Sequence, residues 1–383
     1  MHLSPTLLAA IPLAIWIYLL LARGQFWRVR EDHFDLKPLE NWPRVVAIVP
    51  ARNEAATISQ AISSLAKQDY RGEFSIIVVD DHSEDGAAAL AQQAAEGAGA
   101  SQRMKTQSAA PLAPGWTGKL WALNEGIQVG ASHSPEFFWF TDADIEHAPD
   151  TLSRLVFHAQ KEFLDLASLM VLLQAKTFPE RLLIPPFLYF FLMLYPPRWI
   201  ADPKARTAGA AGGCILLRSS VLERIGGFAA IRGEVIDDCA LARAVKKSGG
   251  KIWMGLTRTS VSLRSYGTFA EMRDLIARTA FTQLRYSFLL LIATLAGLFV
   301  TYLLAWISFF TLDEPGWLLA STAISIMTAT YGATVRFYGL PWLWALTLPF
   351  AAIFYGYATS LSAVRYWLGR GGQWKGRIQA PKE

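Results

Sequence analysis

Hydrophobic residues are concentrated at the two ends of the chain, whereas the middle alternates between short apolar runs and polar segments. Residues 6–22 are almost uniformly apolar, close to the roughly 20 residues that a helix needs to cross a bilayer. Arg23, Arg28 and Arg30 follow this stretch, and basic residues favour the cytoplasmic side of a membrane. We therefore expect a transmembrane anchor over residues 1–23, after which the chain enters the cytoplasm.

Three more apolar stretches lie near the C-terminus, at 287–311, 317–335 and 341–364. They predict a membrane region of two to three spans over 287–364, in which Pro349 and Gly356 make the last span the weakest. A basic tail, 365–383, ends the chain. Three spans would place this tail outside the cell, whereas its positive charge favours the inside, so the number of spans stays open.

Between these ends, residues 42–280 have the pattern of a soluble α/β domain. Strands are predicted where β-branched and aromatic residues cluster, and helices where apolar residues recur every three to four positions, as at Ile58, Ile62 and Leu65. The expected strands are 44–50, 74–80, 137–140 and 215–217, and the expected helices are 54–68, 86–100 and a run starting at 237. This alternation predicts a parallel sheet.

One apolar patch, 182–200, lies inside this range. Paired prolines at 185–186 and 196–197 are expected to cut it, leaving a helix over 187–195 of only about 14 Å. Such a helix cannot cross a hydrocarbon layer of about 30 Å. An interfacial helix and a buried core helix both remain, and aromatic residues on nearly every side favour the interfacial one.

Composition narrows the function classes. Of 383 residues, 52% are hydrophobic and 17% are charged, below the roughly 25% charge of soluble domains. The net charge is +5, but the basic residues gather beside apolar stretches, which suits an anionic membrane face and not nucleic acid. Cys214 and Cys239 have no second pair for a zinc site and are expected to be small buried residues.

The strongest candidate for chemistry is Asp142-Ala143-Asp144, which directly follows the aromatic run 137–140. Residues two apart on an extended strand point to the same side, so both carboxylates can converge where open α/β sheets bind ligands. Two adjacent carboxylates favour a divalent cation, here Mg²⁺ or Mn²⁺ shared with phosphate oxygens. Taken alone, a solvated turn would be the simpler interpretation.

Polar residues also end the first two predicted strands. Those in question are Pro50, Arg52, Asn53 and Glu54 after the first strand, and Asp80 and Asp81 after the second. A carboxylate at this edge of a sheet can accept hydrogen bonds from a nucleobase or a ribose. Helix capping by Asn53 or Ser83 is the alternative.

Three further segments carry candidate residues. The chain has no glycine-rich dinucleotide or P-loop motif, but Lys119 can meet a phosphate as a point charge, or be a solvated loop lysine. Gly212 and Gly213 precede an apolar strand and either permit close approach of a ligand to the backbone or form a simple turn. Asp237 and Asp238 open a helix, where they are either favourable dipole charges or a general base for an attacking hydroxyl.

Taken together and in this order, these motifs resemble the family 2 glycosyltransferases, which have the GT-A fold. The resemblance runs from about residue 45 to 286 and includes Asn124, in the segment GWTGKLWALNEG. Within the family, the chain is most similar to the hopene-associated bacterial glycosyltransferases, with the ceramide glucosyltransferase-like group second. The implied fold is an α/β, Rossmann-like mixed sheet with helices on both faces, here with transmembrane helices at both ends.

The resemblance implies a role for each motif. The nucleotide sugar would bind at Pro50, Arg52, Asn53, Glu54, Asp80, Asp81, Lys119, Asn124, Asp142 and Arg285, and the acceptor at Gly212 and Gly213. Asp144 and Asp142 would hold Mg²⁺ or Mn²⁺, and Asp238, beside Asp237, would be the catalytic base. The reaction would be one displacement that inverts the anomeric carbon.

Two departures from the family pattern refine this expectation. The base motif reads Asp237-Asp238 instead of Glu-Asp, and the Gln-x-x-Arg-Trp motif of processive members is replaced by Thr282-Gln283-Leu284-Arg285-Tyr286. The sequence therefore predicts a bacterial inner-membrane enzyme with a cytoplasmic catalytic domain. It would move one sugar from a nucleoside diphosphate, expected to be UDP, to a lipid hydroxyl, with a hopanoid as the family-based candidate. A processive polysaccharide synthase and a nucleotide-binding membrane protein without activity are the alternatives.

Overall fold

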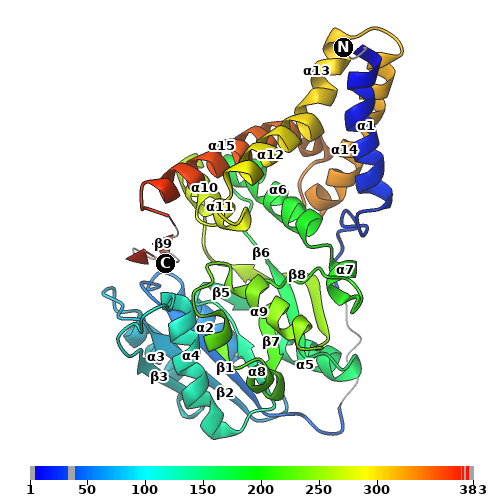
Figure 1. Ribbon diagram of the computed structural model, residues 1–383. Helices are drawn as coiled ribbons and strands as arrows, with labels where there is room; N and C mark the ends of the chain where they lie inside the picture. Colours follow the sequence, from blue (N-terminus) through cyan, green and yellow to red (C-terminus); the bar gives the residue numbers. More distant parts are fainter. Residues whose placement is uncertain (1–4, 33–38, 372, 375–376, 379–383) are drawn as a thin grey trace. The chain divides into compact units, whose positions relative to one another are not determined.

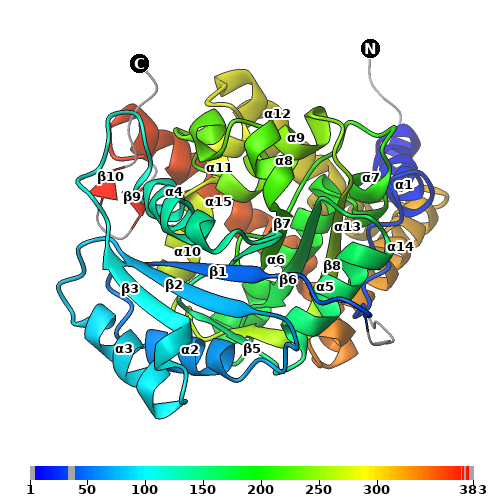
Figure 2. The same cartoon turned by 90° about the horizontal axis from the view of Figure 1, so that it is seen from below.

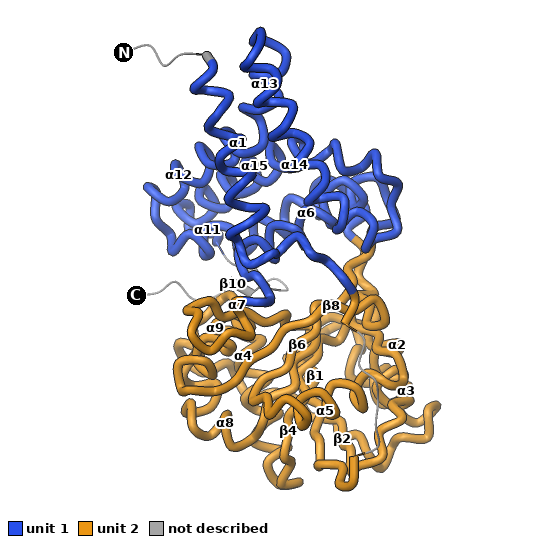
Figure 3. Tube along the Cα trace, turned by 90° about the vertical axis from the view of Figure 1, so that its right-hand side faces the viewer, with its two compact units in different colours: residues 1–30, 175–198, 266–372 blue, residues 31–174, 199–265, 373–383 orange. Residues whose placement is uncertain are grey.

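The computed structural model describes residues 5–32, 39–371, 373–374 and 377–378, and the chain forms two compact units (Figure 1, Figure 3). Unit 1 contains Met1–Arg30, Ala175–Arg198 and Tyr266–Gly372. Unit 2 contains Glu31–Gln174, Trp199–Ser265 and Gln373–Glu383. The soluble domain expected from the sequence was 42–280. In the structure, Ala175–Arg198 groups instead with the apolar helices of unit 1, and the second segment of unit 2 ends at Ser265.

Unit 2 is built on an eight-stranded sheet in the order β3-β2-β1-β4-β7-β6-β8-β5. Its strands are β1 (Val45–Ala51), β2 (Phe74–Asp80), β3 (Met104–Ser108), β4 (Phe137–Phe140), β5 (Ile145–His147), β6 (Leu166–Leu172), β7 (Ile215–Arg218) and β8 (Ile252–Ser262). β1 pairs in parallel with β2 and β4, whereas β7 runs antiparallel to both β4 and β6. The sheet is therefore mixed. The predicted parallel pairing is found among β3, β2, β1 and β4 and between β6 and β8, but not at β7 or between β5 and β8.

Helices cover both faces of this sheet (Figure 2). On one face, α2 (Ile58–Ala66), α3 (Ala87–Gly97) and α5 (Thr151–Lys161) bury their apolar residues in a core shared with Val45, Ala47 and Val49 of β1. Each helix presents apolar residues at a helical spacing, and every second residue of β1 meets them because side chains alternate along a strand.

The opposite face of the sheet carries α4 (Gly118–Gly130). Two glycines let its backbone approach β1 closely: a Cβ added at Gly126 would lie 2.5 Å from Ile48 Cγ2, and one at Gly130 would lie 3.1 Å from Val46 Cγ1. Three short segments next to β7 in the sequence are also helical, α7 (Pro197–Ala201) before it and α8 (Ser219–Arg224) and α9 (Asp237–Lys247) after it. The close approach of α4 places its N-terminal end at the edge of the sheet where β1 and β4 finish.

Unit 1 is helical wherever it has regular structure among the described residues. Its helices are α1 (Pro5–Leu21), α6 (Phe178–Leu194), α10 (Phe269–Ala277), α11 (Ala280–Gln283), α12 (Phe288–Leu298), α13 (Leu304–Thr311), α14 (Gly316–Phe337) and α15 (Leu348–Trp367). In the described part of the chain, Phe288–Thr311 and Gly316–Phe337 are long and apolar enough to cross a membrane, by length and composition only. α1 is shorter, at 17 residues, so membrane spans at both ends stay a prediction. Of the predicted anchor, residues 1–4 lie outside the described residues, as do 372, 375–376 and 379–383 of the predicted tail.

The helix α6 corrects one expectation. It runs unbroken for 17 residues, about 25 Å, across Pro185 and Pro186, which were expected to cut it. A capping box starts it: Glu180 N–H donates to Thr177 Oγ1 at 3.4 Å, and Thr177 N–H donates to Glu180 Oε2 at 2.9 Å. Both prolines are buried, so we attribute the continuity to packing, which offsets a backbone penalty of about 3 kcal/mol.

Candidate functional site

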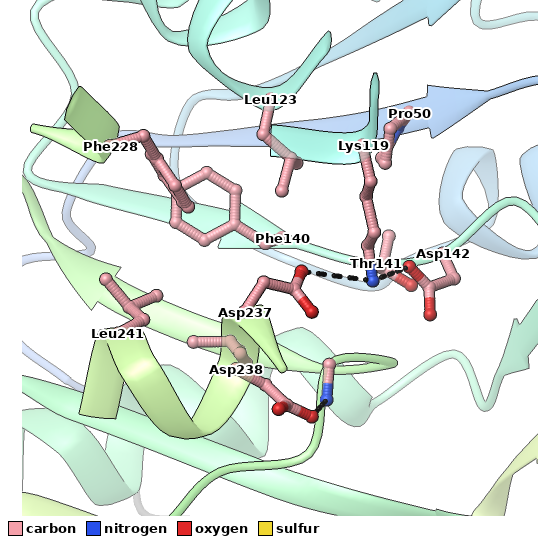
Figure 4. A pocket seen from close by; sticks show the side chains of 12 residues that line it. Pro50, Lys119, Leu123, Phe140, Thr141, Asp142, Phe228, Asp237, Asp238 and Leu241 are labelled. Carbon is pink, nitrogen blue, oxygen red and sulfur yellow. Dashed lines mark hydrogen bonds and ion pairs between the residues drawn. The ribbon is translucent and has the colours of Figure 1, made fainter. Parts of the chain in front are cut away.

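Candidate residues from four separate segments of unit 2 line one hollow at the edge of the sheet (Figure 4). Asp142 comes just after β4, Lys119 belongs to the first turn of α4, Gly212 precedes β7, and Asp237 and Asp238 begin α9. The hollow has about 300 Å³ of space, part of it open to solvent. Its other lining residues are Pro50, Leu123, Phe140, Thr141, Ile215, Phe228 and Leu241. The polar groups therefore stand against a mainly apolar wall, where water screens charges less.

Lys119 joins the two acidic motifs. Its Nζ lies 2.8 Å from Asp142 Oδ1 and 3.4 Å from Asp237 Oδ2 (Figure 4). Burial acts to lower the pKa of Lys119, but the nearby carboxylates, Asp142 foremost, outweigh it and raise that pKa above its ordinary value. The ammonium group therefore stays charged and holds the end of β4 and the start of α9 together.

Asp238 is held by two backbone groups. Its Oδ2 accepts a hydrogen bond from Gly212 N–H at 2.9 Å, and its Oδ1 accepts one from Cys239 N–H at 2.7 Å. Burial, followed by the charge of Asp237, raises the pKa of Asp238 to about 6. A fixed carboxylate with such a pKa can take a proton from a hydroxyl group near neutral pH.

Asp144 meets a different cation from Asp142. Arg264 Nε lies 3.2 Å from Asp144 Oδ2, and Arg264 Nη2 lies 2.8 Å from Glu54 Oε1. Burial, and then the charge of Asp142, raises the pKa of Asp144 to about 6. The two carboxylates of the Asp-x-Asp motif are thus close enough to repel each other, as expected, although each has its own protein cation.

The carboxylates fit a divalent cation by their chemistry. Hard carboxylate oxygens suit Mg²⁺ or Mn²⁺, which take one or two protein carboxylates and complete their shells with water and phosphate. Among the described residues there is no group of three or more His, Cys, Asp or Glu side chains arranged to hold a metal alone. A cation at Asp142 and Asp144 would therefore depend on oxygens from the substrate.

The ends of β1 and β2 are tied together through side chains. Asn53 N–H donates to Ser83 Oγ at 3.0 Å, and Asn53 Oδ1 accepts from Glu84 N–H at 2.9 Å. The N-caps of α2 and α3 are Thr57 and Gly86, so the capping role proposed for Asn53 and Ser83 is wrong. The two side chains instead connect the loops that border the edge of the sheet.

The acidic pair at the end of β2, Asp80 and Asp81, is buried. Asp80 and Asp81 are 7% and 1% exposed, and Arg52 Nη1 donates to the carbonyl oxygen of Asp81. Asp80 Oδ2 accepts from Ser83 N–H at 3.3 Å, whereas its buried Oδ1 has no hydrogen-bond partner within the described structure. A buried acceptor without a partner costs about 1–3 kcal/mol, so a ligand donor here would be favourable.

Four predicted residues differ in how the structure places them. A Cβ added at Gly212 would lie 3.3 Å from Lys119 Nζ and 3.4 Å from Asp238 Oδ2, so this glycine keeps a narrow space open between them. Gly213 is buried against Val171 and does not line the hollow. Asn124 lies on α4 but is likewise absent from the lining. Arg285 belongs to unit 1, so its predicted donor contact stays a prediction.

Sequence reasoning missed Arg264 and the apolar wall formed by Phe140 and Phe228. Arg264 follows β8, a strand that was not predicted, so nothing in the sequence placed it at this edge. Phe140 was assigned to a strand without a role, although the last residue of a strand that leads into Asp-x-Asp must lie near the site.

Comparison with known families decides the class of the domain. Residues 46–226 match the family described as Glycosyl transferase family 2. The chain contains a family 2 glycosyltransferase domain. An N-acetylglucosaminyltransferase from Rhizobium leguminosarum bv. viciae is 27% identical over 222 residues, which is 56% of this chain and 47% of that protein. One from Mesorhizobium japonicum is 49% identical over 45 residues, 12% of this chain and 11% of that protein. The chain thus spans less than half the length of these curated relatives.

A solved structure gives the same class of fold. A mannosyltransferase from Pyrobaculum calidifontis, in complex with GDP-Man and Mn²⁺, aligns with a TM-score of 0.51 at 20% identity. The alignment covers 92% of this chain and 99% of that one. At this identity the likeness establishes the fold alone. The predicted family 2 domain is therefore confirmed, together with an α/β GT-A-like mixed sheet, whereas the subgroup within the family stays a prediction.

Proposed function

We propose that this protein is a metal-dependent, inverting glycosyltransferase that moves one sugar from a nucleoside diphosphate sugar to a lipid hydroxyl at a membrane. One observation carries the proposal: Asp142 of the Asp-x-Asp motif lines the same hollow as Asp237 and Asp238, which are far away in sequence, and Asp142 and Asp237 are both ion-paired with Lys119. A domain that only bound a nucleotide would have no need of a second acidic pair with a raised carboxyl pKa beside the first.

The charges around the hollow explain the need for a metal. Asp142, Asp237 and Asp238 line the hollow with one cation, Lys119. Beside them, Asp144 and Glu54 share a second cation, Arg264, so carboxylates outnumber cations among these seven side chains. A diphosphate would be repelled by this net negative charge unless a further cation came with it. Mg²⁺ or Mn²⁺ held by the Asp-x-Asp motif would supply that charge and offset the negative charge developing on the leaving diphosphate.

The nucleoside would be held at the ends of β1 and β2. The unpartnered Oδ1 of Asp80 offers an acceptor to a base or ribose donor, and the buried Asp81 lies next to it. Arg52 fixes this loop through the carbonyl oxygen of Asp81. Relatives named as N-acetylglucosaminyltransferases support a UDP-linked donor.

Asp238 would act as the base. The N–H groups of Gly212 and Cys239 orient its carboxylate, and its raised pKa matches proton transfer near neutral pH. As Asp238 takes the hydroxyl proton, the acceptor oxygen bonds to the anomeric carbon and the bond to the diphosphate oxygen breaks with its electron pair. Gly212 would border the acceptor, because a side chain at this position would crowd Lys119 Nζ and Asp238 Oδ2.

The apolar character of unit 1 supports a lipid acceptor. Several of its large apolar side chains are exposed, among them Leu289 at 77%, Phe310 at 75% and Leu343 at 72%. Such surface is stable in a bilayer and costly in water. We place the protein in the bacterial inner membrane with its catalytic domain in the cytoplasm, and a hopanoid is the acceptor that the subgroup resemblance suggests.

The test is a transfer assay with purified protein, labelled nucleotide sugars, Mn²⁺ or Mg²⁺ and total bacterial lipid, followed by mass analysis of new glycolipids. We expect one product whose mass exceeds that of a lipid by a single sugar, and its loss on chelation with EDTA. A ladder of masses would point to a processive synthase. Nucleotide binding without transfer from any donor would refute the enzymatic proposal.

A further inference from the structure

A buried chain of hydrogen bonds runs beneath the hollow of unit 2. Ser260 Oγ lies 2.9 Å from His147 Nδ1, His147 Nε2 lies 2.8 Å from Thr141 Oγ1, and Thr141 Oγ1 lies 3.0 Å from the carbonyl oxygen of Gly213. His147, Thr141 and Ser260 are at most 3% exposed. The four residues belong to four segments: β5, the end of β4, β8 and the loop before β7.

The chemistry of the groups fixes the direction of this chain. A carbonyl oxygen only accepts, so the single hydroxyl proton of Thr141 must point to Gly213. Thr141 Oγ1 then accepts from His147 Nε2–H, and the neutral ring accepts at Nδ1 from the hydroxyl of Ser260. Each donor has one acceptor, so neutral His147 is held in its Nε2–H tautomer.

Packing fixes the ring as well. The imidazole packs at a tilt of 54° against the indole of Trp139 with ring centroids 4.7 Å apart, and Trp139 Nε1–H donates to Cys214 Sγ at 3.3 Å. Burial lowers the pKa of His147 to about 3, so the ring stays neutral at physiological pH. The backbone of His147 is also held, because its N–H donates to Ser64 Oγ at 3.1 Å.

Two members of this hydrogen-bond chain, Thr141 and Gly213, are next in sequence to residues that flank the proposed reaction. Thr141 is the residue before Asp142, and Gly213 follows Gly212, whose N–H holds the carboxylate of Asp238. The single bond from Thr141 to Gly213 therefore joins the Asp-x-Asp loop to the loop that orients the base. The length of this hydrogen bond therefore contributes to the distance between the bound donor and Asp238.

We propose that His147 is a positioning residue of this glycosyltransferase: by fixing the hydroxyl of Thr141 on the carbonyl of Gly213, it sets the distance between the donor-binding carboxylates and Asp238. The inference rests on the proposed function and adds to it a residue that touches neither sugar nor nucleotide. Because it concerns the alignment of two bound reactants, it affects the rate of the chemical step more than the binding of either one.

The test compares Thr141→Val, Thr141→Ser and His147→Phe in full-length protein, with single-turnover rates and donor KM. Valine keeps the shape of threonine without the hydroxyl, and phenylalanine keeps a ring on Trp139 without the N–H. We expect both to lower kcat by about 10- to 100-fold with donor KM changed less than about threefold, since misplacement by about 1 Å costs up to about 100-fold. Thr141→Ser is expected to recover most of the rate lost in Thr141→Val.

Two measurements separate alignment from general loss of stability. Gln68→Met is the matched control, because Gln68 is also buried and bonded to backbone groups of Ser64, Ala148 and Leu152, but has no bond to Thr141 or Gly213. Gln68→Met is expected to lower Tm as Thr141→Val and His147→Phe do, but to leave kcat per folded molecule unchanged. The double variant of His147→Phe and Thr141→Val is expected to lose no more rate than either single variant, as for residues acting as one unit.

Several results would overturn the inference. If Thr141→Val and His147→Phe lose rate only in proportion to the fall in folded fraction, as expected for Gln68→Met, the role of His147 is purely structural. The same conclusion follows if Thr141→Ser recovers none of the rate lost in Thr141→Val. Additive losses in the double variant would show that His147 does not act through Thr141. Absence of transfer by the unmodified protein would instead refute the proposed function, so the two failures are distinct.

Discussion

Replacing Asp238 with asparagine is expected to abolish sugar transfer and yet make the protein more stable. The carboxylate is the proposed base, and an amide of the same size cannot accept the hydroxyl proton. A general base contributes about 100- to 10,000-fold to a rate, so transfer should fall by at least that lower factor. Nucleotide binding should persist, because the donor contacts proposed here lie at β1, β2 and the Asp-x-Asp motif.

The gain in stability follows from the environment of Asp238. Its pKa is raised from 3.8 to about 6, which corresponds to about 3 kcal/mol against the charged form in the folded state. Asparagine removes this charge but keeps only one acceptor for the N–H groups of Gly212 and Cys239, and losing one such bond costs about 1–2 kcal/mol. The net expectation at pH 7.5 is a gain of about 1–2 kcal/mol, a rise in Tm of about 2–8 °C.

The pH dependence of the effect tests its cause. A raised carboxyl pKa means that the folded state binds a proton more tightly than the unfolded chain, so ionisation costs stability above about pH 6 and costs none below pH 3.8. The advantage of Asp238→Asn should therefore be full at pH 7.5 and shrink as the pH falls from 6 towards 4. Thermal unfolding at pH 7.5 and 5.0 measures it.

A second variant, Asp237→Asn, serves as the comparison, and two outcomes would contradict the prediction for Asp238→Asn. Asp237→Asn removes the neighbouring charge too, but also an ion-pair partner of Lys119 at 3.4 Å, so it is expected to gain less or to lose stability. Retained turnover in Asp238→Asn would remove Asp238 as the base. A clear drop in Tm at pH 7.5 would show that its carboxylate is not under electrostatic strain.

Three further outcomes are expected. With Asp238 as the base, kcat should be constant above about pH 6 and fall about tenfold per pH unit below it; a rate unchanged down to pH 5 would contradict the assignment. Asp144→Ala should weaken donor binding in Mn²⁺ by at least about tenfold in calorimetry but not in EDTA, and an unchanged metal dependence would count against Asp144 as a ligand. Arg264→Met should raise Mn²⁺ affinity about tenfold in spin-resonance titrations, because the guanidinium 3.2 Å from Asp144 no longer competes; equal or weaker binding would mean that Arg264 does not oppose the metal.

The parts of the fold that the sequence predicted well are those with strong local patterns. β2 and β4 begin and end where the apolar runs do, and α9 starts at Asp237 as expected. β6 and β8, in contrast, were not predicted, and β8 alternates less clearly because it carries Arg258 and three buried polar positions, Thr257, Ser260 and Ser262, among its apolar residues. Their pairing is long-range, so no local signal records it.

The candidate site shows the same division. Motif order was enough to bring Asp142 and Asp238 into one place, because both motifs stand at strand or helix ends that a GT-A sheet gathers at one edge. The partners of these carboxylates were not predictable. Lys119, which pairs with Asp142, and Arg264, which pairs with Asp144, reach their positions through helix packing and strand pairing, and such contacts depend on neighbours that are distant in sequence.

The glycines of α4 also have a consequence for how this site can change. The distance between Lys119 and Asp142 depends on how closely α4 packs against the sheet. Gly126, about two turns further along α4, sets that packing distance. A Cβ at Gly126 would lie 2.5 Å from Ile48 Cγ2 and 3.1 Å from Val79 Cγ2, and would push α4 away from the sheet. The position of the ammonium group is thus governed by a residue on the same helix that does not line the hollow, and an inventory of the pocket lining alone would overlook it.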